Sequence, residues 1–219
     1  MRNIDILEIM RARHSVRQYT GKRIEDDKRR ILDELAEECN AESGLSIQVV
    51  YDEPKCFGSM MARYGKFSGC ENYFAIVGRK GSDLDEKAGY YGERLVLKAQ
   101  ELGLNTCWAA LTHGRSAAKV EKGEKLAIVI ALGYGVNQGV PHKNRPLAEV
   151  CCQTEDMPEW FERGMEAVML APTALNQQKF RFKLDGDRVA AAATGGVYSA
   201  IDLGIVKYHF EAATGHKVC

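Results

Sequence analysis

The chain has 219 residues, the length of one large domain or two small ones. Its 30 basic residues balance its 30 acidic residues. This balance argues against a nucleic-acid or membrane-surface partner, because such proteins usually carry a net basic charge. The seven cysteines are odd in number and contain no C-x-x-C pair. Such a pattern is typical of reduced thiols, so we expect a soluble cytoplasmic protein without metal sites or membrane spans.

Helical and strand patterns alternate along the chain. Apolar residues at helical spacing predict a short helix near the N-terminus and longer helices over 24–40, 85–105, 158–171 and 199–215. Stretches rich in β-branched and aromatic residues predict strands over 45–52, 71–79 and 125–135. Residues 179–194 predict a hairpin with a turn at Asp185–Gly186, whereas the glycine-containing segment 56–70 remains ambiguous.

These elements lack the strict βαβ order of a doubly wound sheet. We therefore predict an α+β fold, with a mixed, mainly antiparallel sheet flanked by helices, as one domain over residues 1–219. A helix–turn–strand pattern at 25–52 occurs again at 158–184. This similarity is either an internal repeat or a coincidence of pattern.

The stretch RHSVR concentrates positive charge near the start of a neutral chain. In an extended segment Arg13, Ser15 and Arg17 lie on one face, and His14 and Val16 lie on the other. Two guanidinium groups flanking a hydroxyl suit a phosphate, because arginine offers bidentate donors. The alternative is a solvated basic segment.

A second basic stretch, KNRP, follows the buried strand 125–135. Lys143 and Arg145 alternate in this proline-bounded stretch, so both can point the same way. Binding sites for charged small molecules often lie at the ends of buried strands. Four cations exceed the charge of one phosphate, so we expect one or two to pair with an acid or to contact another part of the ligand.

The third candidate element is the loop APTALNQQ at 171–178. Its amide side chains can read the edge of a planar heterocycle by hydrogen bonds. Ordinary loop polarity is the alternative. The vicinal Cys151 and Cys152 are interpreted as structural, because neighbouring cysteines seldom form an unstrained disulfide.

Together these elements resemble the FMN-dependent nitroreductase family. RHSVR resembles its R-x-S-x-R/K phosphate motif, and GLNTCWAAL resembles the segment after its central helix. KNRP resembles its C-terminal K-x-R, and APTALNQQ its A-P-S-x-x-N-x-Q-P loop. The resemblance implies an NAD(P)H-dependent flavin oxidoreductase that uses FMN. Hydride would pass through flavin N5 to a small-molecule substrate such as a nitroaromatic or a quinone.

The resemblance also implies the site residues. Arg13, Ser15 and Arg17 would hold the phosphate and the pyrimidine side of the ring, and backbone N–H groups near Ala110 and Leu111 would face N5. The full implied set of cofactor-binding residues is Arg13, His14, Ser15, Arg17, Lys66, Ala110, Leu111, Lys143, Arg145, Pro172, Thr173, Asn176 and Gln178.

One departure from the family pattern is informative. In the family, the proline–amide loop normally follows the second helix and reaches the flavin of a partner subunit. Here that place reads NAESGLSIQ, and the motif follows the helix at 158–171 instead. We interpret this as an internally duplicated, pseudo-dimeric chain that supplies the loop in cis, so both a monomer and a homodimer remain open.

Other functions also remain open. The protein could bind FMN without turnover, as a sensor, store or scaffold, and it could be a dedicated reductive enzyme of the same family. A phosphate- or nucleotide-binding domain that happens to share the basic segment would be colourless.

Overall fold

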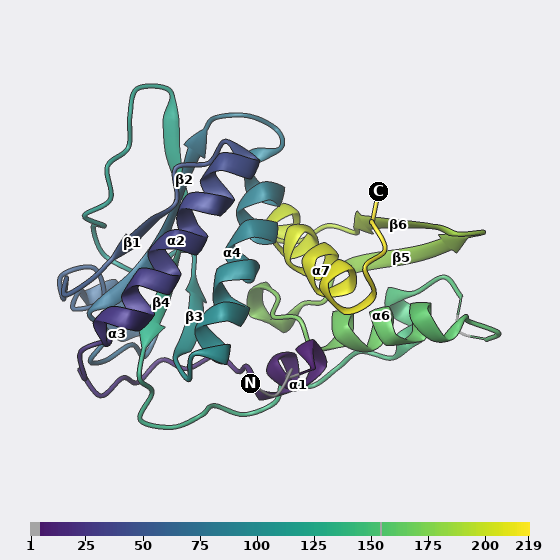
Figure 1. Cartoon of the computed structure of the whole chain (residues 1–219), viewed down its shortest axis with the longest axis horizontal. Helices are drawn as coiled ribbons and strands as arrows, with labels where there is room; N and C mark the ends of the chain where they lie inside the picture. The colour runs from purple at the N-terminus through teal and green to yellow at the C-terminus, as the bar shows by residue number, and fades with distance from the viewer. Residues whose placement is uncertain (1–4, 154) are drawn as a thin grey trace. The chain divides into compact units, whose positions relative to one another are not determined.

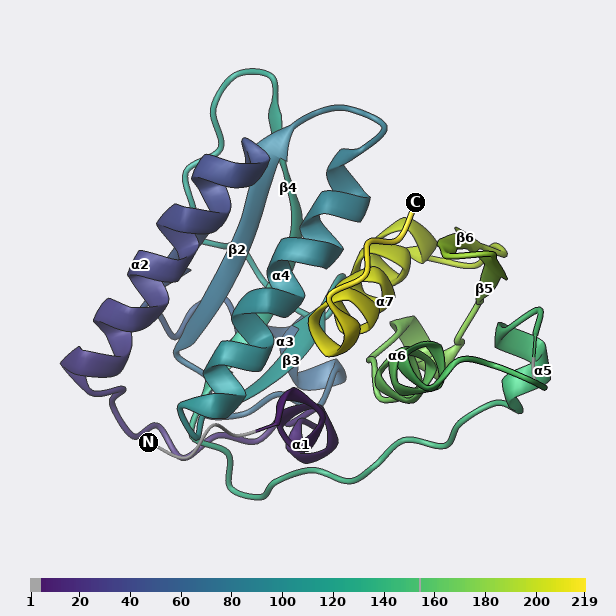
Figure 2. The same cartoon turned by 45° about the vertical axis from the view of Figure 1, so that its right-hand side comes forward.

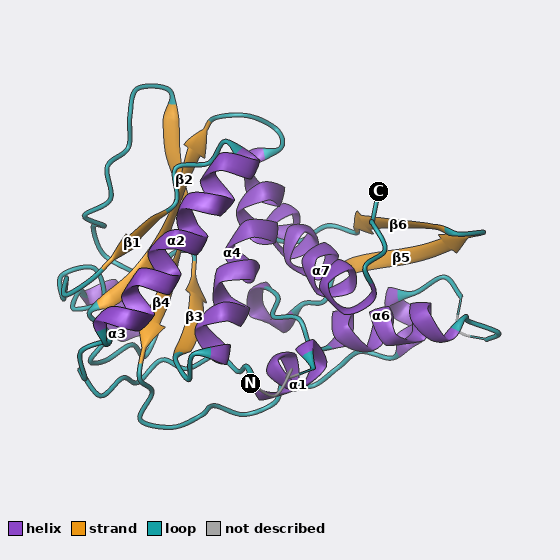
Figure 3. Cartoon of the chain, viewed as in Figure 1, coloured by secondary structure: helices purple, strands orange, loops and turns teal. Residues whose placement is uncertain are grey.

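The computed structural model describes residues 5–153 and 155–219, which divide into two compact units. The sheet unit comprises Ala12–Leu84 and Arg94–Val140, and the hairpin unit comprises the residues up to Arg11, Asp85–Glu93 and Pro141–Cys219. Each unit is described separately below. Figures 1 and 3 show the elements of both units in chain order and by type.

The sheet unit is built on a four-stranded antiparallel sheet with the strand order β1-β2-β4-β3. Its strands are β1 (Gln48–Val50), β2 (Asn72–Arg79), β3 (Asn105–Ala109) and β4 (Glu124–Gly133). Seven of the eight residues of β2 are buried, because its nearly continuous apolar sequence packs on both faces. The sheet confirms the predicted α+β class.

Strand β1 is shorter than the expected strand 45–52. The Asn40 side chain bonds both the N–H and the C=O of Ile47, which holds the chain before the strand at the end of a helix. At the other end, Asp52 has a left-handed backbone with φ of 54°, which ends the extended conformation. Only three residues therefore pair with β2.

Helices α2 (Asp26–Ser43) and α4 (Leu84–Glu101) lie side by side over one face of the sheet (Figure 2). Arg94 links them, since its guanidinium bonds Glu38 and Glu42 at 2.9–3.1 Å. Helix α2 stops at Gly44, whose φ of 72° suits a residue without a side chain. A short helix that the sequence left ambiguous, α3 (Met60–Tyr64), begins at Ser59, whose hydroxyl accepts the Ala62 N–H.

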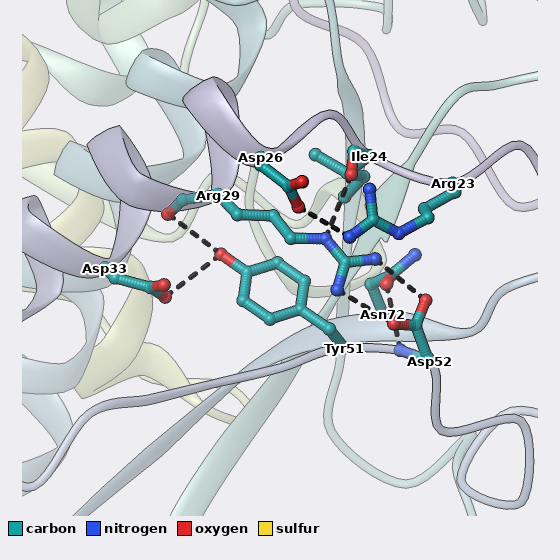
Figure 4. A network of polar contacts seen from close by, with 8 residues as sticks. All are labelled: Arg23, Ile24, Asp26, Arg29, Asp33, Tyr51, Asp52 and Asn72. Carbon is teal, nitrogen blue, oxygen red and sulfur yellow. Dashed lines mark hydrogen bonds and ion pairs between the residues drawn. The ribbon is translucent and has the colours of Figure 1, made fainter.

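A polar network joins α2 to the end of β1 and the start of β2 (Figure 4). The Arg29 guanidinium makes two 2.8 Å bonds to Asp52 and lies 4.4 Å from the centre of the Tyr51 ring. The Tyr51 hydroxyl donates to Asp33, and the Asp52 N–H donates to the side-chain oxygen of Asn72. Arg29 therefore combines a bidentate ion pair with stacking, a geometry that lysine cannot reproduce.

The hairpin unit packs helices against a two-stranded antiparallel hairpin. Its core contains Phe210, whose ring centroid lies 5.5 Å from those of both Phe161 and Phe182. Its elements are α1 (Ile6–Ala12), the first half of α4, α5 (Leu147–Val150), α6 (Glu159–Met169), the 3₁₀ turn η1 (Ala174–Asn176), β5 (Phe180–Asp185), β6 (Arg188–Ala193) and α7 (Ser199–Thr214).

The turn of the hairpin differs by one position from the expected one. Asp185 pairs with Arg188, so the two central turn residues are Gly186 and Asp187, and Gly186 has a positive φ of 59°. A glycine at the first central position is favoured in such tight turns. The segments 25–52 and 158–184 both contain a helix followed by a strand, and their origin by duplication stays a prediction.

Helices α4 and α7 approach each other closely at two glycines of the hairpin unit. A Cβ atom on Gly89 would lie 2.0 Å from the Ile201 carbonyl oxygen, and one on Gly204 would lie 2.0 Å from that of Glu86. Only glycine fits at these two positions.

Among the described residues, none of the helices combines the length and the apolarity that crossing a bilayer requires.

The ion pair of Asp52 predicts a stability difference that depends on pH. The hydrogen bonds from Arg29 lower the pKa of Asp52 below its ordinary value of 3.8. The pair therefore stabilises the folded state above about pH 4, and this stabilisation is lost as the pH falls through the lower folded-state pKa. Because the Asp52 side chain is 57% exposed, we expect Asp52→Asn to cost no more than ~1 kcal/mol near neutral pH.

Urea unfolding of both proteins between about pH 7 and pH 2.5 measures this difference. We expect the gap between wild type and variant to close at the acid end. A gap of constant size would contradict the ion pair, because asparagine also tolerates the left-handed backbone of this position.

The close contact at Gly204 predicts whether a larger side chain there raises or lowers the stability of the protein. Helix propensity alone would make Gly204→Ala stabilising by about 1 kcal/mol. Because the new Cβ would also lie 2.6 Å from the Tyr90 backbone nitrogen, we expect overpacking to destabilise the variant by about 1–3 kcal/mol instead. Thermal unfolding distinguishes the two: a lower Tm supports the close contact, and a raised Tm contradicts it.

Candidate functional site

The RHSVR segment lies beside strand β3 without forming a regular strand. Ser15 makes a single parallel bridge with Thr106, whose carbonyl accepts the Val16 N–H at 3.0 Å. Val16 is buried, whereas Ser15 and Arg17 are exposed, as the expected alternation requires. Arg13 differs, because its side chain is only 3% exposed.

The loop after β4 closes over this segment. Tyr19 pairs with Gly135, and the Val136 N–H donates to the Gln18 carbonyl. A Cβ atom on Gly139 would lie 2.7 Å from the His14 Cβ, and Gly139 has a positive φ of 72°. Backbone hydrogen bonds and close packing therefore fix the path of the basic segment.

The groups behind this segment are neutral. Burial raises the pKa of the Cys107 thiol, although Arg17, a hydrogen bond with Ser15, and Arg13 all act in the opposite direction. Burial likewise raises the pKa of Tyr19 well above its ordinary value. Neither residue carries a negative charge near pH 7. Within the described residues, Arg17 makes no salt bridge, so its positive charge remains available to an anion.

Lys66 lies on a segment attached to the same place. It follows α3 with a left-handed φ of 65°, and its side chain is exposed. Two residues later, the Ser68 N–H donates to the Arg17 carbonyl, and the Ser68 carbonyl accepts the Tyr19 N–H. The structure thus brings the backbone near Lys66 to the RHSVR segment.

Ala110 and Leu111 continue directly from β3. Leu111 is 68% exposed. Ala110 lies four residues beyond Thr106, or ~13 Å along an extended chain. The segment is supported from α3, since a Cβ on Gly65 would lie 2.5 Å from the Thr112 Cβ. The predicted N5 contacts and the phosphate donors therefore lie at opposite ends of one strand, as an elongated ligand would require.

In the hairpin unit, the two basic residues of KNRP are both exposed. Arg145 forms an ion pair with Glu149 at 2.9 Å, which is the kind of acid pairing expected for one of the four cations. The spacing of these two residues, four apart, is the sequence signal that could have identified the pair. Lys143 makes no salt bridge to any carboxylate that the structure describes.

The amides of the loop 171–178 bond to protein groups. Asn176 and Gln178 both donate to the Lys143 carbonyl, and Gln178 also accepts the Arg145 N–H. Thr173 accepts the Gln178 N–H through its hydroxyl, and Pro172 is buried. Direct contacts from these residues to a cofactor stay a prediction.

The sequence did not identify Asp202 as part of this region. Asp202, at the start of α7, is 3% exposed and accepts the Ala174 N–H and the Gln177 amide. Burial raises the pKa of Asp202, and these two hydrogen bonds partly oppose the rise. An acid three residues into a predicted helix is common, so its position alone gave no signal.

The donor set fits the phosphate of FMN. Arg17 and Ser15 are exposed on a fixed backbone, and guanidinium and hydroxyl groups are the donors that phosphate takes in proteins. The predicted residues fall in both units: Arg13, His14, Ser15, Arg17, Lys66, Ala110 and Leu111 in the sheet unit, and the others in the hairpin unit. Their action on one cofactor stays a prediction.

Comparison with solved structures shows the fold. A "putative nitroreductase" from Thermotoga maritima is 22% identical, with a TM-score of 0.70 over 97% of this chain and 85% of that one. A "putative nitroreductase" from Desulfovibrio desulfuricans, solved in complex with FMN, is 21% identical. Its TM-score is 0.55 over 71% of this chain and 99% of that one. No curated protein matches the sequence.

A protein-family model extends the similarity to the sequence itself. The model described as "Putative TM nitroreductase" matches residues 5–214, nearly the whole length. With the fold and the basic segments already placed, the match confirms the resemblance that the motifs suggested. The chain belongs to this nitroreductase family.

Proposed function

We propose that the protein is an FMN-dependent oxidoreductase that takes hydride from NAD(P)H and reduces a small acceptor such as a nitroaromatic or a quinone. Membership of the nitroreductase family supports an oxidoreductase. The Desulfovibrio desulfuricans structure with the same fold holds FMN, which supports that cofactor here. The observation that carries the proposal is the exposed, unneutralised Arg17 beside Ser15 on a fixed backbone.

Bound FMN would supply the redox chemistry, by accepting a hydride at N5 and passing electrons to the acceptor. The residues of this chain would bind and orient it. Ser15 and Arg17 would donate hydrogen bonds to the phosphate and the pyrimidine side, and the backbone after Ala109 would face N5. Arg13, being buried, would act through its charge.

We also propose that the site is completed within one chain. The Desulfovibrio desulfuricans structure is covered almost entirely by 71% of this chain. The loop at 171–178 would then supply, within this chain, the amides that the motif resemblance assigns to a partner subunit. On this proposal Lys143 and Arg145 bind the cofactor phosphate.

The first test is whether the purified protein binds and reduces FMN. We expect one FMN per chain, an absorption band in the visible region, and bleaching of that band on anaerobic addition of NADH or NADPH. Bleaching should reverse when a quinone is added. Bound FMN that neither nucleotide bleaches would indicate a binding protein without turnover, and a colourless protein that takes up no FMN would refute the proposal.

The second test concerns Arg17. Charge-assisted hydrogen bonds contribute ~1.5–3 kcal/mol, so Arg17→Ala should weaken FMN binding roughly tenfold to 150-fold. The positive charge of Arg17 would stabilise the reduced form of bound FMN, which is the more negative form. Removing this charge should therefore also lower the reduction potential. Flavin fluorescence titration and spectroelectrochemistry measure the two effects.

A matched control is Arg30→Ala, which removes an equally charged side chain that is 72% exposed on α2. It should leave both the FMN affinity and the potential unchanged. An unchanged potential in FMN-loaded Arg17→Ala would refute the assigned role of Arg17.

A further inference from the structure

We propose that Gln178, assisted by Asn176, is a positioning residue that fixes the backbone of Lys143–Arg145 for phosphate binding. This inference rests on the proposed function. It gives the loop amides a different role from direct reading of the flavin, because they act through the basic segment.

The Gln178 side chain forms hydrogen bonds with the backbone at both ends of the segment Lys143–Arg145. Its Oε1 accepts the Arg145 N–H at 3.0 Å, and its Nε2 donates to the Lys143 carbonyl at 2.8 Å. Asn176 donates a second 2.8 Å bond to the same carbonyl and accepts from the Gln178 Nε2. The Gln178 side chain is 4% exposed, so its amide is fully engaged with protein groups.

The loop holds these amides in a strained backbone. Leu175, Asn176 and Gln178 have φ values of 52°, 52° and 45°, a region that side chains rarely adopt. Such conformations persist only where surrounding contacts enforce them, and they cluster at functional sites. Here Asp202 accepts the Ala174 N–H and the Gln177 amide, while Thr173 accepts the Gln178 N–H.

The basic segment needs this support. Residues 134–146 contain no helix and no strand of two or more residues, and both basic side chains of KNRP are exposed. A backbone that must become ordered on binding loses affinity for its ligand, because ordering costs conformational entropy. Pre-organisation by Gln178 should therefore strengthen binding of the phosphate. It should not affect contacts with the flavin ring.

The test compares FMN with riboflavin, which has the same ring system and no phosphate. Gln178→Met keeps the side-chain length and removes both the donor and the acceptor. Gln178→Glu keeps the acceptor for the Arg145 N–H and replaces the donor. Leu175→Ala is the matched control, because Leu175 has the same left-handed backbone and is 91% exposed.

For each protein, the Kd of FMN and of riboflavin is measured by fluorescence titration, together with the Tm. We expect the preference for FMN over riboflavin to fall roughly tenfold in Gln178→Met and at least threefold in Gln178→Glu, with Leu175→Ala unchanged. The riboflavin Kd should stay constant. If Gln178→Met does not fold, the result for Gln178→Glu decides.

A Lys143→Ala/Arg145→Ala double variant separates failure of the inference from failure of the proposed function. If it lowers the FMN preference but the Gln178 variants do not, the positioning role is wrong and the proposed site stands. Loss of FMN and riboflavin affinity by the same factor in the Gln178 variants also overturns the inference, because it reports a purely structural role. If wild type shows no FMN preference, the proposed function fails and the inference fails with it.

Discussion

The candidate site depends on one backbone hydrogen bond pattern, the attachment of the RHSVR segment to the start of β3. An anion site needs cations that are fixed in place yet not neutralised by neighbouring acids. Side-chain ion pairs would fix Arg17 but also cancel its charge. Here the Val16 N–H bonds the Thr106 carbonyl, Tyr19 bridges Gly135, and the buried Val16 anchors the segment. The segment is thus held without an ion pair between Arg17 and any carboxylate of residues 5–153 and 155–219.

The second basic segment meets the same requirement by different means. Lys143 and Arg145 lie in a long irregular stretch that has no sheet to pair with. Amide side chains replace the missing strand partner, because an amide offers a donor and an acceptor as a backbone does. Arg145 also bonds Glu149, which reduces the available charge on this side. Of these two basic residues, Lys143 is the one that makes no salt bridge to a carboxylate that the structure describes.

Features that depend on neighbouring residues alone could be predicted from the sequence, as the RHSVR segment shows. The period-2 alternation put Ser15 and Arg17 on one face and Val16 on the other, and in the structure Val16 is buried while Ser15 and Arg17 are exposed. Arg13 did not follow this pattern, because it precedes the first bridge, where the chain is irregular just after α1. The family resemblance added what periodicity could not, namely the expected cofactor and the grouping of distant motifs.

Long-range contacts of loops were not predictable from the sequence. The sequence singled out Asn176 and Gln178 for their amide side chains, but it gave no indication of their partners, which lie more than 30 residues earlier in the chain. The shortening of β1 has the same origin, since it depends on where the Asn40 side chain finds its partners. The position of the hairpin turn at Gly186–Asp187 depends on how β5 and β6 are aligned. The sequence alone does not determine this register to within one residue.

In both helix–loop–strand segments, a side-chain amide bonds a backbone N–H and a backbone C=O, but the bonded segments differ. In the first, the Asn40 amide bonds both the N–H and the C=O of Ile47, and it holds the chain as it leaves α2 toward β1. In the second, the Gln178 amide bonds an N–H and a C=O of the separate basic segment. The Asn40 amide thus fixes a connection within the sheet unit, whereas the Gln178 amide fixes the basic segment within the hairpin unit.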